Sequence, residues 1–482
     1  MEPYKAQFIQ FLLDTEALKI GGPFRTKSGR DSPYFLNVGA FDNGEKISKA
    51  GRYYAEAIKS AVGDKFDVLL GIPNKGIPLV VATSAALAEM GINKGWAFYR
   101  KDAKTYGEAT GSGVTKEQMQ RETLVGSLVP DGSVILPVDD VITTSETKRE
   151  ADEIMRRITN GVKMPYGIIA VDRQEINEDG EVAIEQFASE KGTRYKPIVT
   201  ASEIFDWLKE NNKLSPADEA AFKLYFRAWG TAEVRKKYGL GGDKLIEGRT
   251  VLPACDVPYE AFEPLVEATA DIPRIGGYKI PAHAGRKGWE RWVEAARKHT
   301  KKPLIYDHQK GGTDIPNTAK QFMKDLKAAG LDAVILFPLS GPRTQVAWTG
   351  EALQQGLTVF VGAEMTHPRF KRSEGGYISD EALDEMFLMA ARQGVNHFIV
   401  PGNKVDRIAH YRELIEGTGI EPVFASPGLV EQGGRISDAV KVAGDNWHGI
   451  VGRAITEKRT VEEIRAAAKE LTSQFNINSA GS

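Results

Sequence analysis

In the first half of the chain, short apolar runs alternate with longer segments of helical periodicity. The runs are FDVLLGIP, GWAFYR, SVILPVDDV and YGIIAVDR, which begin at residues 66, 95, 133 and 166. None shows the polar–apolar alternation of a half-exposed strand, so they indicate parallel strands buried on both faces. Segments 50–62 and 147–161 between them have helical spacing. The order predicts an α/β fold with a doubly wound sheet.

The second half repeats one strand–helix unit. Strand-like runs begin at residues 250, 275, 303, 332, 357, 396, 421 and 448, and helical stretches such as GWERWVEAARKH and TAKQFMKDLKAAG separate them. Eight such units in roughly 230 residues predict a (β/α)₈ TIM barrel, whose usual size is about 250 residues.

Between these halves, residues 203–248 are helical, charged and interrupted by Ser-Pro and Gly-Leu-Gly-Gly. We therefore predict a first domain over 1–212, a helical linker over 213–247 and a barrel domain over 248–475. Residues 1–20 predict an amphipathic helix without the basic start and long apolar core of a secretion signal. No apolar run reaches the length of a transmembrane helix.

Composition narrows the class of protein. The 482 residues include 63 Lys and Arg against 65 Asp and Glu, a net charge of −2, so nothing in the overall charge favours nucleic acid or a membrane. Cys255 is the single cysteine, which excludes a disulfide within the chain and fits a reducing, cytoplasmic location. All seven histidines lie from His283 onward. Chemistry in the first half must therefore use lysine, arginine, carboxylates, hydroxyls and backbone amides.

One motif in the first half carries candidate chemistry. Residues 134–147 read VILPVDDVITTSET, an apolar strand that ends in Asp139 and Asp140 and continues into a hydroxyl-rich loop that opens a helix. Backbone N–H groups and hydroxyls at a helix start bind phosphate, and paired acids can accept hydrogen bonds from a ribose diol. The alternative is an acidic cap on a surface turn. It is disfavoured because adjacent acids at a buried strand end are costly without a ligand or cation.

This motif resembles the phosphoribosyl diphosphate signature of the type I phosphoribosyltransferases, although Ser145 stands where that family usually has glycine or alanine. Four further segments, 24–35, 71–79, 99–111 and 171–175, resemble orotate phosphoribosyltransferase in particular. The resemblance implies that Lys101, Lys104 and Glu108 are catalytic residues of a mobile loop. It implies substrate-binding roles for Lys27, Lys75, Arg100, Asp139, Asp140, Thr143, Thr144, Ser145, Thr147 and Arg173. Tyr106 replaces a histidine that is frequent in the family.

These residue types suit the implied reaction. Displacement of diphosphate from ribose C1 passes through an oxocarbenium-like state and needs cationic groups on the leaving diphosphate. A basic loop that closes and then opens would supply them, whereas the alternative is a solvated basic turn. Magnesium is implied as a cofactor carried by the phosphoribosyl diphosphate, since the sequence shows no magnesium cage of its own.

In the second half, polar groups recur where the predicted barrel strands end. Asp256, Lys279, Asp307 and Lys310 follow the first three strands, and the loops 363–368, 426–434 and 451–455 follow later ones. Function in such barrels lies at the carboxyl ends of the strands. Taken singly, Asp256 has an alternative as a helix cap and Lys279 as a solvated side chain.

Over roughly residues 248–470 this set resembles orotidine 5′-phosphate decarboxylase. The resemblance implies that Lys279, Asp307, Lys310 and Asp314 are catalytic, with Asp314 serving the neighbouring subunit, and that no cofactor is used. It implies substrate-binding roles for Asp256, Thr366, Gln432, Gly433, Gly452 and Arg453, with Thr366 on the pyrimidine and Gln432 and Arg453 on the phosphate. Loss of CO₂ from the pyrimidine ring would leave a carbanion at C6. A charged lysine beside this carbon would stabilise the carbanion and then protonate it.

One spacing departs from the commoner Asp-x-Lys-x-x-Asp. Here two residues, His308 and Gln309, separate Asp307 from Lys310. Residues i and i+3 do not share a face of a regular strand. We therefore predict that the backbone leaves the ladder or bulges at His308 and Gln309. We also predict that His308 orients this turn and takes no part in proton transfer.

Together the halves resemble the bifunctional uridine 5′-monophosphate synthase family. The expected reactions convert orotate and phosphoribosyl diphosphate to orotidine 5′-phosphate and diphosphate, and then to UMP and CO₂, in a homodimer or larger homo-oligomer. Two alternatives stay open. In the first, only one half is catalytically active and the first half is a phosphoribosyl diphosphate-binding module. In the second, the barrel acts on sugar phosphates with a metal.

Overall fold

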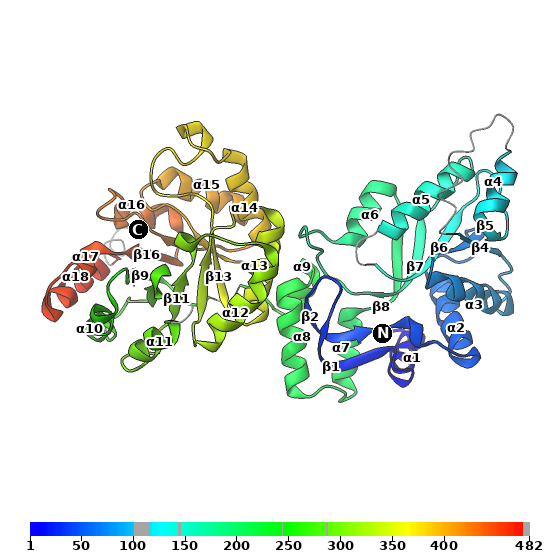
Figure 1. Ribbon diagram of the computed structural model, residues 1–482, viewed down its shortest axis with the longest axis horizontal. Helices are drawn as coiled ribbons and strands as arrows, with labels where there is room; N and C mark the ends of the chain where they lie inside the picture. Colours follow the sequence, from blue (N-terminus) through cyan, green and yellow to red (C-terminus); the bar gives the residue numbers. More distant parts are fainter. Residues whose placement is uncertain (101–114, 143–145, 243, 286–287, 476–482) are drawn as a thin grey trace, which may run out of the picture. The chain divides into compact units, whose positions relative to one another are not determined.

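The computed structural model describes residues 1–482 except 101–114, 143–145, 243, 286–287, 476–482 and the side chain of Lys310. By its internal contacts the chain forms two compact units (Figure 1). The first comprises Met1–Asn177 and Glu181–Phe222, and the second comprises Glu178–Gly180 and Lys223–Ser482. The division falls inside a helix of the stretch that we predicted as a linker.

The first unit is built on a six-stranded sheet in the order β5-β4-β3-β6-β7-β8. All neighbours pair in parallel except β4 and β5, which are antiparallel. The strands are β3 (Val68–Gly71), β4 (Gly95–Tyr99), β5 (Leu124–Gly126), β6 (Ile135–Val141), β7 (Tyr166–Asp172) and β8 (Arg194–Thr200). β3 is buried throughout and β6 is buried up to Asp140, so the expectation of strands covered on both faces is confirmed.

Helices of the first unit are α1 (Pro3–Asp14), α2 (Gly44–Ala61), α3 (Gly76–Glu89), α4 (Lys116–Thr123), α5 (Glu146–Ile158), α6 (Ala183–Lys191) and α7 (Ala201–Glu210). A separate hairpin pairs β1 (Leu18–Arg25) with β2 (Asp31–Leu36). The prediction of one helix over residues 1–20 is therefore wrong at its end. The helix stops at Asp14, and Leu18 already pairs with Leu36 in the hairpin.

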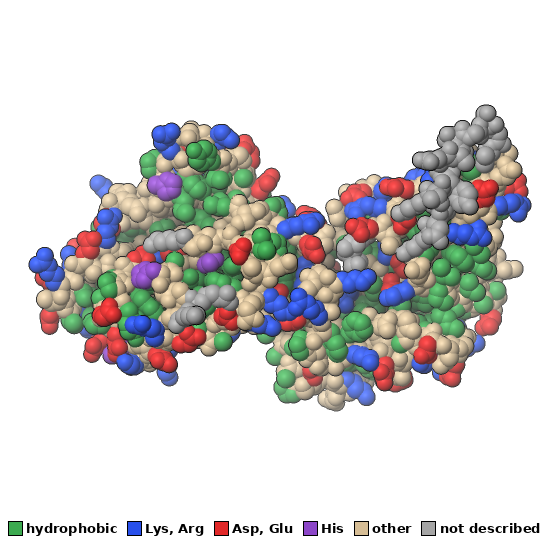
Figure 2. All heavy atoms as spheres, in the orientation of Figure 1, with side chains coloured by type: hydrophobic (Ala, Val, Ile, Leu, Met, Phe, Trp, Pro, Cys, Tyr) green, Lys and Arg blue, Asp and Glu red, His purple; other side chains and the backbone are tan. Residues whose placement is uncertain are grey.

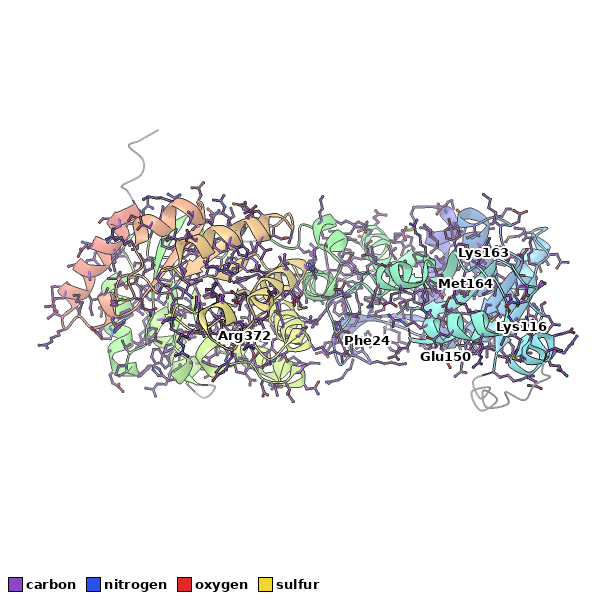
Figure 3. The ribbon with its side chains drawn as sticks, turned by 90° about the horizontal axis from the view of Figure 1, so that it is seen from above. Phe24, Lys116, Glu150, Lys163, Met164 and Arg372 are labelled. Carbon is purple, nitrogen blue, oxygen red and sulfur yellow. The ribbon has the colours of Figure 1, made fainter. Side chains whose placement is uncertain are left out.

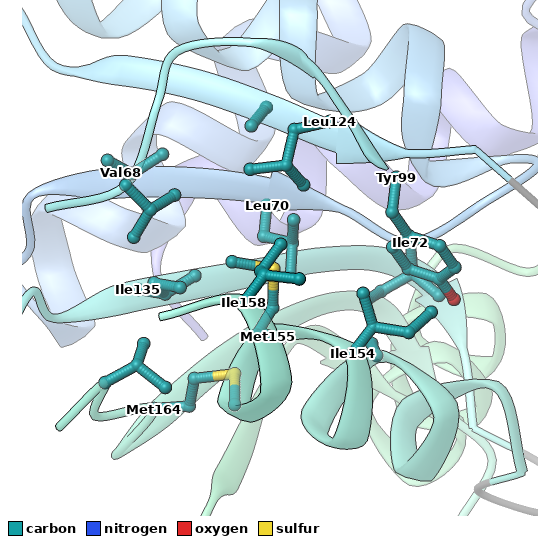
Figure 4. Packing of buried hydrophobic residues seen from close by; sticks show 14 residues of the cluster. Val68, Leu70, Ile72, Tyr99, Leu124, Ile135, Ile154, Met155, Ile158 and Met164 are labelled. Carbon is teal, nitrogen blue, oxygen red and sulfur yellow. The ribbon is translucent and has the colours of Figure 1, made fainter. Parts of the chain in front are cut away.

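One face of the sheet packs on α5. Ile154, Met155 and Ile158 of that helix meet Val68 and Leu70 of β3 in a fully buried cluster (Figure 4). Met164, labelled in Figures 3 and 4, lies between α5 and β7 and belongs to the same cluster. This apolar layer packs the middle and last turns of α5 against β3 and the first residue of β6, Ile135.

The second unit is an eight-stranded parallel barrel in the order β10-β11-β12-β13-β14-β15-β16-β9. Isolated bridges from Val251 to Ile275 and from Ala254 to Lys279 join β9 to β10 and complete the ring. The predicted TIM barrel is confirmed, with one strand for each apolar run. The strands are β9 (Arg249–Pro253), β10 (Tyr278–Ile280), β11 (Leu304–Asp307), β12 (Ala333–Leu336), β13 (Thr358–Gly362), β14 (His397–Ile399), β15 (Val423–Ser426) and β16 (Trp447–Val451).

Helices alternate with these strands. They are α10 (Tyr259–Thr269), α11 (Trp289–Arg297), α12 (Ala319–Ala328), α13 (Pro342–Gln354), α14 (Asp380–Arg392), α15 (Val405–Glu416), α16 (Ile436–Ala443), α17 (Arg453–Thr456) and α18 (Val461–Ser473). Before the barrel come α8 (Pro216–Trp229) and α9 (Ala232–Lys237). Gly350 of α13 has no side chain where the ring of Trp229 lies, and Trp229 Nε1 donates to Gln354 Oε1 at 2.7 Å. The end of α8 is thereby fixed to α13.

The surface carries mixed charge. Figure 2 shows lysine and arginine side chains interspersed with acidic ones over the visible face of each unit. Within the described residues, no helix has both the length and the hydropathy to cross a bilayer.

Two buried histidines pack in the barrel wall. His448 accepts or donates a hydrogen bond with Thr250 Oγ1 at 2.8 Å, and His397 Nε2 accepts one from the backbone N–H of Leu245 at 3.3 Å. Burial lowers the pKa of His448 to about 4 and that of His397 to about 3. Both rings are therefore neutral in the folded protein near neutral pH.

These two rings predict a pH-dependent stability of the barrel. An unfolded histidine titrates near pH 6.5, so between pH 6.5 and about 4 the unfolded chain binds protons that the folded chain does not. The free energy of unfolding should fall as the pH falls, by up to about 1.4 kcal/mol per pH unit for each histidine. We expect His448→Asn, which keeps a partner for Thr250, to flatten this slope in urea unfolding measured between pH 7 and 5. The same change at the exposed His367 is the control; equal slopes in all three proteins would contradict the prediction.

Candidate active sites

The acid pair of the first unit lies at the carboxyl end of β6. Asp139 and Asp140 are both buried, with 5% and 9% of their surface exposed. Asp139 is ion-paired with Lys148 of α5, and Asp140 Oδ2 with Lys75 Nζ at 2.8 Å. The hydroxyl of Tyr54 donates to the backbone carbonyl of Asp139 at 2.7 Å. Each acid therefore has its own lysine.

Burial raises the pKa of the Asp139 carboxyl to about 6, because the opposing charge of Lys148 only partly offsets the loss of water and Asp140 adds a like charge. The strand end thus holds a carboxylate that is ionised near neutral pH but close to titration. Such a perturbed group in a polar strand end is typical of a binding or catalytic site.

The loop after β3 brings Lys75 to this pair. A Cβ on Gly71 would lie 2.7 Å from the carbonyl oxygen of Gly76, and a Cβ on Gly76 would lie 2.6 Å from that of Val138. Glycine at both positions lets the loop press against β6. Lys75 immediately precedes α3, and its side chain is 48% exposed. Its ammonium can therefore reach a ligand as well as Asp140.

Arg173 follows β7 and lies against the hairpin. Its guanidinium pairs with Glu175 Oε1 at 2.8 Å, stacks on the ring of Tyr34 at 4.6 Å and donates to Ser32 Oγ at 3.4 Å. Ser32 and Tyr34 belong to segment 24–35, which also contains Lys27, a predicted substrate-binding residue. Two motifs about 140 residues apart in sequence therefore meet here.

The remaining predicted residues of this unit fall into two groups. Lys27 is exposed in the hairpin turn, Thr147 lies in the first turn of α5, and Arg100 Nη1 donates to the carbonyl of Glu122 at 2.8 Å at the end of α4. The second group lies outside the described residues and consists of Lys101, Lys104, Tyr106, Glu108, Thr143, Thr144 and Ser145.

The barrel has a pocket of about 330 Å³. The strand-end residues predicted for substrate meet there, since the lining includes Asp256, Lys279, Thr366, Gln432, Gly452 and Arg453. Among the predicted residues, Asp307, Gly433 and Asp314 do not line this pocket. Asp307 lies behind Lys279 with no exposed surface, and Asp314 is exposed.

Lys279 is the central charge of this pocket. Its ammonium is ion-paired with Asp307 and lies 3.5 Å from Asp256 Oδ2. Burial by itself lowers the pKa of Lys279, but the two carboxylates outweigh it and hold that pKa above its ordinary value. The lysine therefore stays protonated although only 4% of its side chain is exposed.

The unusual spacing after β11 has a structural explanation. The strand ends at Asp307, and a 3₁₀ turn over Gln309–Gly311 replaces it. The backbone leaves the ladder as predicted. The side chain of Lys310 lies outside the described part of the chain, so its convergence with Asp307 stays a prediction.

His308 and Gln309 differ in their roles in this turn. The His308 ring stacks on Trp348 at 5.2 Å and contacts Phe322 at 4.6 Å, and burial lowers its pKa to about 4. It is absent from the pocket lining, which agrees with the expectation of an orienting residue. Gln309 lines the pocket and donates to Asp307 twice, from its backbone N–H at 3.2 Å and its side chain at 3.3 Å.

The sequence patterns gave no individual site role to Gln309, Lys148 or Glu364, although Gln309 was expected in a bulge and Glu364 lies in the strand-end loop 363–368. Glu364 precedes Thr366 by two residues and has no exposed side chain, yet it accepts hydrogen bonds from Lys404 (2.9 Å), Arg407 (2.8 Å) and Tyr411 (2.6 Å). Burial alone raises the pKa of Glu364, but these donors reverse the effect and lower it. Its position at a barrel strand end was the available signal, but its partners come from the next strand–helix unit.

Comparison with known proteins finds similarity in both halves of the chain. Residues 269–469 match the model of the family described as Orotidine 5′-phosphate decarboxylase / HUMPS family. Orotate phosphoribosyltransferase of Methylococcus capsulatus is 38% identical over 234 residues, which are 48% of this chain and 100% of the relative. That of Escherichia coli O9:H4 is 37% identical over 231 residues, again 48% of this chain and 100% of the relative.

A crystal structure of the Francisella tularensis orotate phosphoribosyltransferase has 32% identity and a TM-score of 0.40, covering 47% of this chain and 100% of that one. The curated relatives are matched over their whole length at more than one third identity. The chain therefore belongs to the orotate phosphoribosyltransferase family through its first half, and its second half matches the orotidine 5′-phosphate decarboxylase / HUMPS family model.

Proposed function

We propose that this chain makes UMP in two steps, from orotate and phosphoribosyl diphosphate to orotidine 5′-phosphate, and then to UMP with loss of CO₂. The observation that carries the proposal is the barrel pocket, where Lys279 between two carboxylates shares one cavity with Thr366, Gln432 and Arg453. A buried cation beside acids suits charge development at carbon, and a separate arginine suits a phosphate. The whole-length match to orotate phosphoribosyltransferases supports the first step.

In the first step, Asp139 and Asp140 would accept hydrogen bonds from the ribose hydroxyls, and Lys75 would exchange Asp140 for the diphosphate. Arg173 would hold the orotate carboxylate, with Lys27 from the hairpin turn near the ring. Arg100 and Lys101, Lys104 and Glu108 of the following loop would cover the diphosphate as it leaves. Thr143, Thr144, Ser145 and Thr147 would hold the 5′-phosphate at the start of α5.

Magnesium fits this site as part of the substrate. The described residues contain no cluster of three or more His, Cys, Asp or Glu side chains that could hold a metal, and Lys148 and Lys75 already neutralise the acid pair. Oxygen atoms of a diphosphate are the hard ligands that Mg²⁺ prefers. The ion would neutralise charge on the leaving diphosphate. The lysines of the chain would bind the outer oxygens of the diphosphate.

In the second step, the bond from C6 to the carboxyl carbon breaks and its electron pair stays on C6. Lys310 would give C6 a proton, and Asp307, Lys279 and Asp314 would complete the alternating charges around it. Asp256 would contact the ribose, and Thr366 the pyrimidine. Gln432, Gly433, Gly452 and Arg453 would bind the phosphate, whose binding energy contributes to the rate although it lies away from C6. No cofactor is needed in this scheme.

Three features of the whole protein belong to the proposal. The transferase is assigned to residues 1–212 and the decarboxylase to 248–475, with the linker of 213–247 between them. The exposure of Asp314 outside the barrel pocket supports a homodimer in which this acid serves the partner's site. The buried free thiol of Cys255 is compatible with the reducing cytoplasm.

Lys279→Met in the full chain separates the two steps. Met fills a similar volume without charge and leaves Asp307 without its lysine, so decarboxylation should fall by at least about a thousandfold. With orotate and magnesium phosphoribosyl diphosphate, the variant should accumulate orotidine 5′-phosphate, and the unaltered chain should form UMP, both followed by chromatography. If the unaltered chain leaves orotate unconsumed but still decarboxylates supplied orotidine 5′-phosphate, the result would instead favour a first half that only binds phosphoribosyl diphosphate.

Arg453→Ala tests the phosphate site. Loss of a charge-assisted hydrogen bond should lower kcat/KM for orotidine 5′-phosphate by about 10- to 100-fold, mainly through a higher KM, and leave phosphoribosyl transfer unchanged. Arg459→Ala, an exposed position beyond α17, is the matched control. An unchanged KM would remove Arg453 from the phosphate site.

A shared decarboxylase site predicts complementation between inactive variants. Lys310→Ala and Asp314→Asn should each be nearly inactive alone. After unfolding and refolding a mixture, about half the dimers should be mixed, each with one intact site, so roughly a quarter of all sites should recover. If Asp314 served its own chain, no site in a mixed dimer would be intact. Mixed dimers proven by mass spectrometry without recovered activity would therefore exclude a shared site.

A further inference from the structure

The two acids at the end of β6 face lysines of very different accessibility. Asp140 and Lys75 have side chains that are 13% and 48% exposed, whereas Asp139 and Lys148 are 7% and 5% exposed. Lys75 can leave its partner for a ligand and remain hydrated. Lys148 cannot, because separation would leave a buried charge unpaired on each side.

We propose that Lys148 is a positioning residue of the phosphoribosyl transfer, which keeps the Asp139 carboxylate ionised and oriented while substrates bind and leave. This role rests on the proposed transferase function and goes beyond it. Lys148 lies one residue past the motif from which the site was predicted and need not touch any substrate.

The contacts of the ammonium explain how it would act. Lys148 Nζ donates to Asp139 Oδ2 and to the backbone carbonyl of Val141 at 2.7 Å. These acceptors lie on either side of Asp140 in the chain, so one charge fixes the strand end around both acids. Lys148 also belongs to the first turn of α5, whose apolar face packs on β3. The helix start and the acid pair are thereby held in one arrangement.

The surroundings of Asp139 make its charge depend on this lysine. The groups that face or influence it are Lys148 from α5, Asp140 on β6 with its partner Lys75, Tyr54 from α2, Tyr99 from β4 and Tyr195 from β8. Lys148 is the cation in contact with it, and Asp140 adds a like charge. Since burial already raises the pKa of Asp139 to about 6, removal of the ammonium would raise that pKa further. A protonated Asp139 would be a poor acceptor of hydrogen bonds from the ribose hydroxyls at neutral pH.

Lys148→Gln in the full chain tests the proposal, because glutamine keeps a donor but carries no charge. We expect the acid limb of kcat/KM for phosphoribosyl diphosphate, measured with saturating orotate and magnesium from pH 5.5 to 8.5, to move up by about one pH unit or more. KM should rise at pH 7 more than kcat falls. Lys148→Arg restores the charge and should return the limb toward that of the unaltered chain.

Arg149→Gln provides the matched control. Arg149 is the next residue of α5 and pairs with Glu190 at 2.9 Å on the surface, so its loss removes one positive charge from the same helix without touching Asp139. Its acid limb should stay in place. A limb that moves equally in Lys148→Gln and Arg149→Gln, or in neither, would overturn the role of Lys148.

If circular dichroism shows that Lys148→Gln does not fold, Asp139→Asn decides the question. Removing the titrating carboxyl should abolish the acid limb and lower activity at every pH, and a limb that persists at the original pH would overturn the proposal. Absence of transfer by the unaltered chain would overturn the proposed function and this role together. An active chain with an unmoved limb overturns the role of Lys148 alone.

Discussion

A buried carboxylate at the end of a parallel strand needs a cation beside it, and in both units of this protein a lysine supplies that cation. Asp139 has Lys148, and Asp307 has Lys279. A lone charge in either position would cost several kcal/mol, whereas a paired and hydrogen-bonded one is tolerated. The pairs allow charged groups to lie where apolar strands end, which is the place where substrates of α/β proteins bind.

The two pairs differ in what the lysine can do. Lys148 comes from a helix and also donates a hydrogen bond to the backbone carbonyl of Val141. Its side chain is buried. Lys279 comes from a strand, lies between two acids and lines the pocket. Burial shifts the pKa of both Asp139 and Lys279 toward the neutral form, but the charged neighbours of the two groups differ. Asp139 has one cation and one competing acid and is close to titration, whereas the two carboxylates beside Lys279 hold its proton firmly.

Another buried acid beside the barrel pocket, Glu364, is also paired with cationic side chains. Glu364 is held by Lys404 and Arg407, and Asn403 donates from its side chain to the backbone carbonyl of Thr366 at 3.1 Å. The loop after β14 and the start of α15 thus hold the residues after β13 through side-chain hydrogen bonds. In the turn after β11, aromatic packing of His308 takes the place of ion pairs, so that its neighbour Gln309 faces the pocket.

The local pattern was sufficient for the strands of the barrel and most of the sheet, because strands buried on both faces read as continuous apolar runs. It also pointed to Asp139, Asp307 and Lys279, which lie at the ends of those runs, but it did not point to Lys148, which lies in α5. It missed the hairpin, whose first strand alternates in burial and begins within a segment of helical spacing. It could not find the partners of Lys148 or Glu364 either. A sequence pattern reports which residues are buried, but packing between elements decides which side chains meet, and Glu364 meets Lys404 across 40 residues of chain.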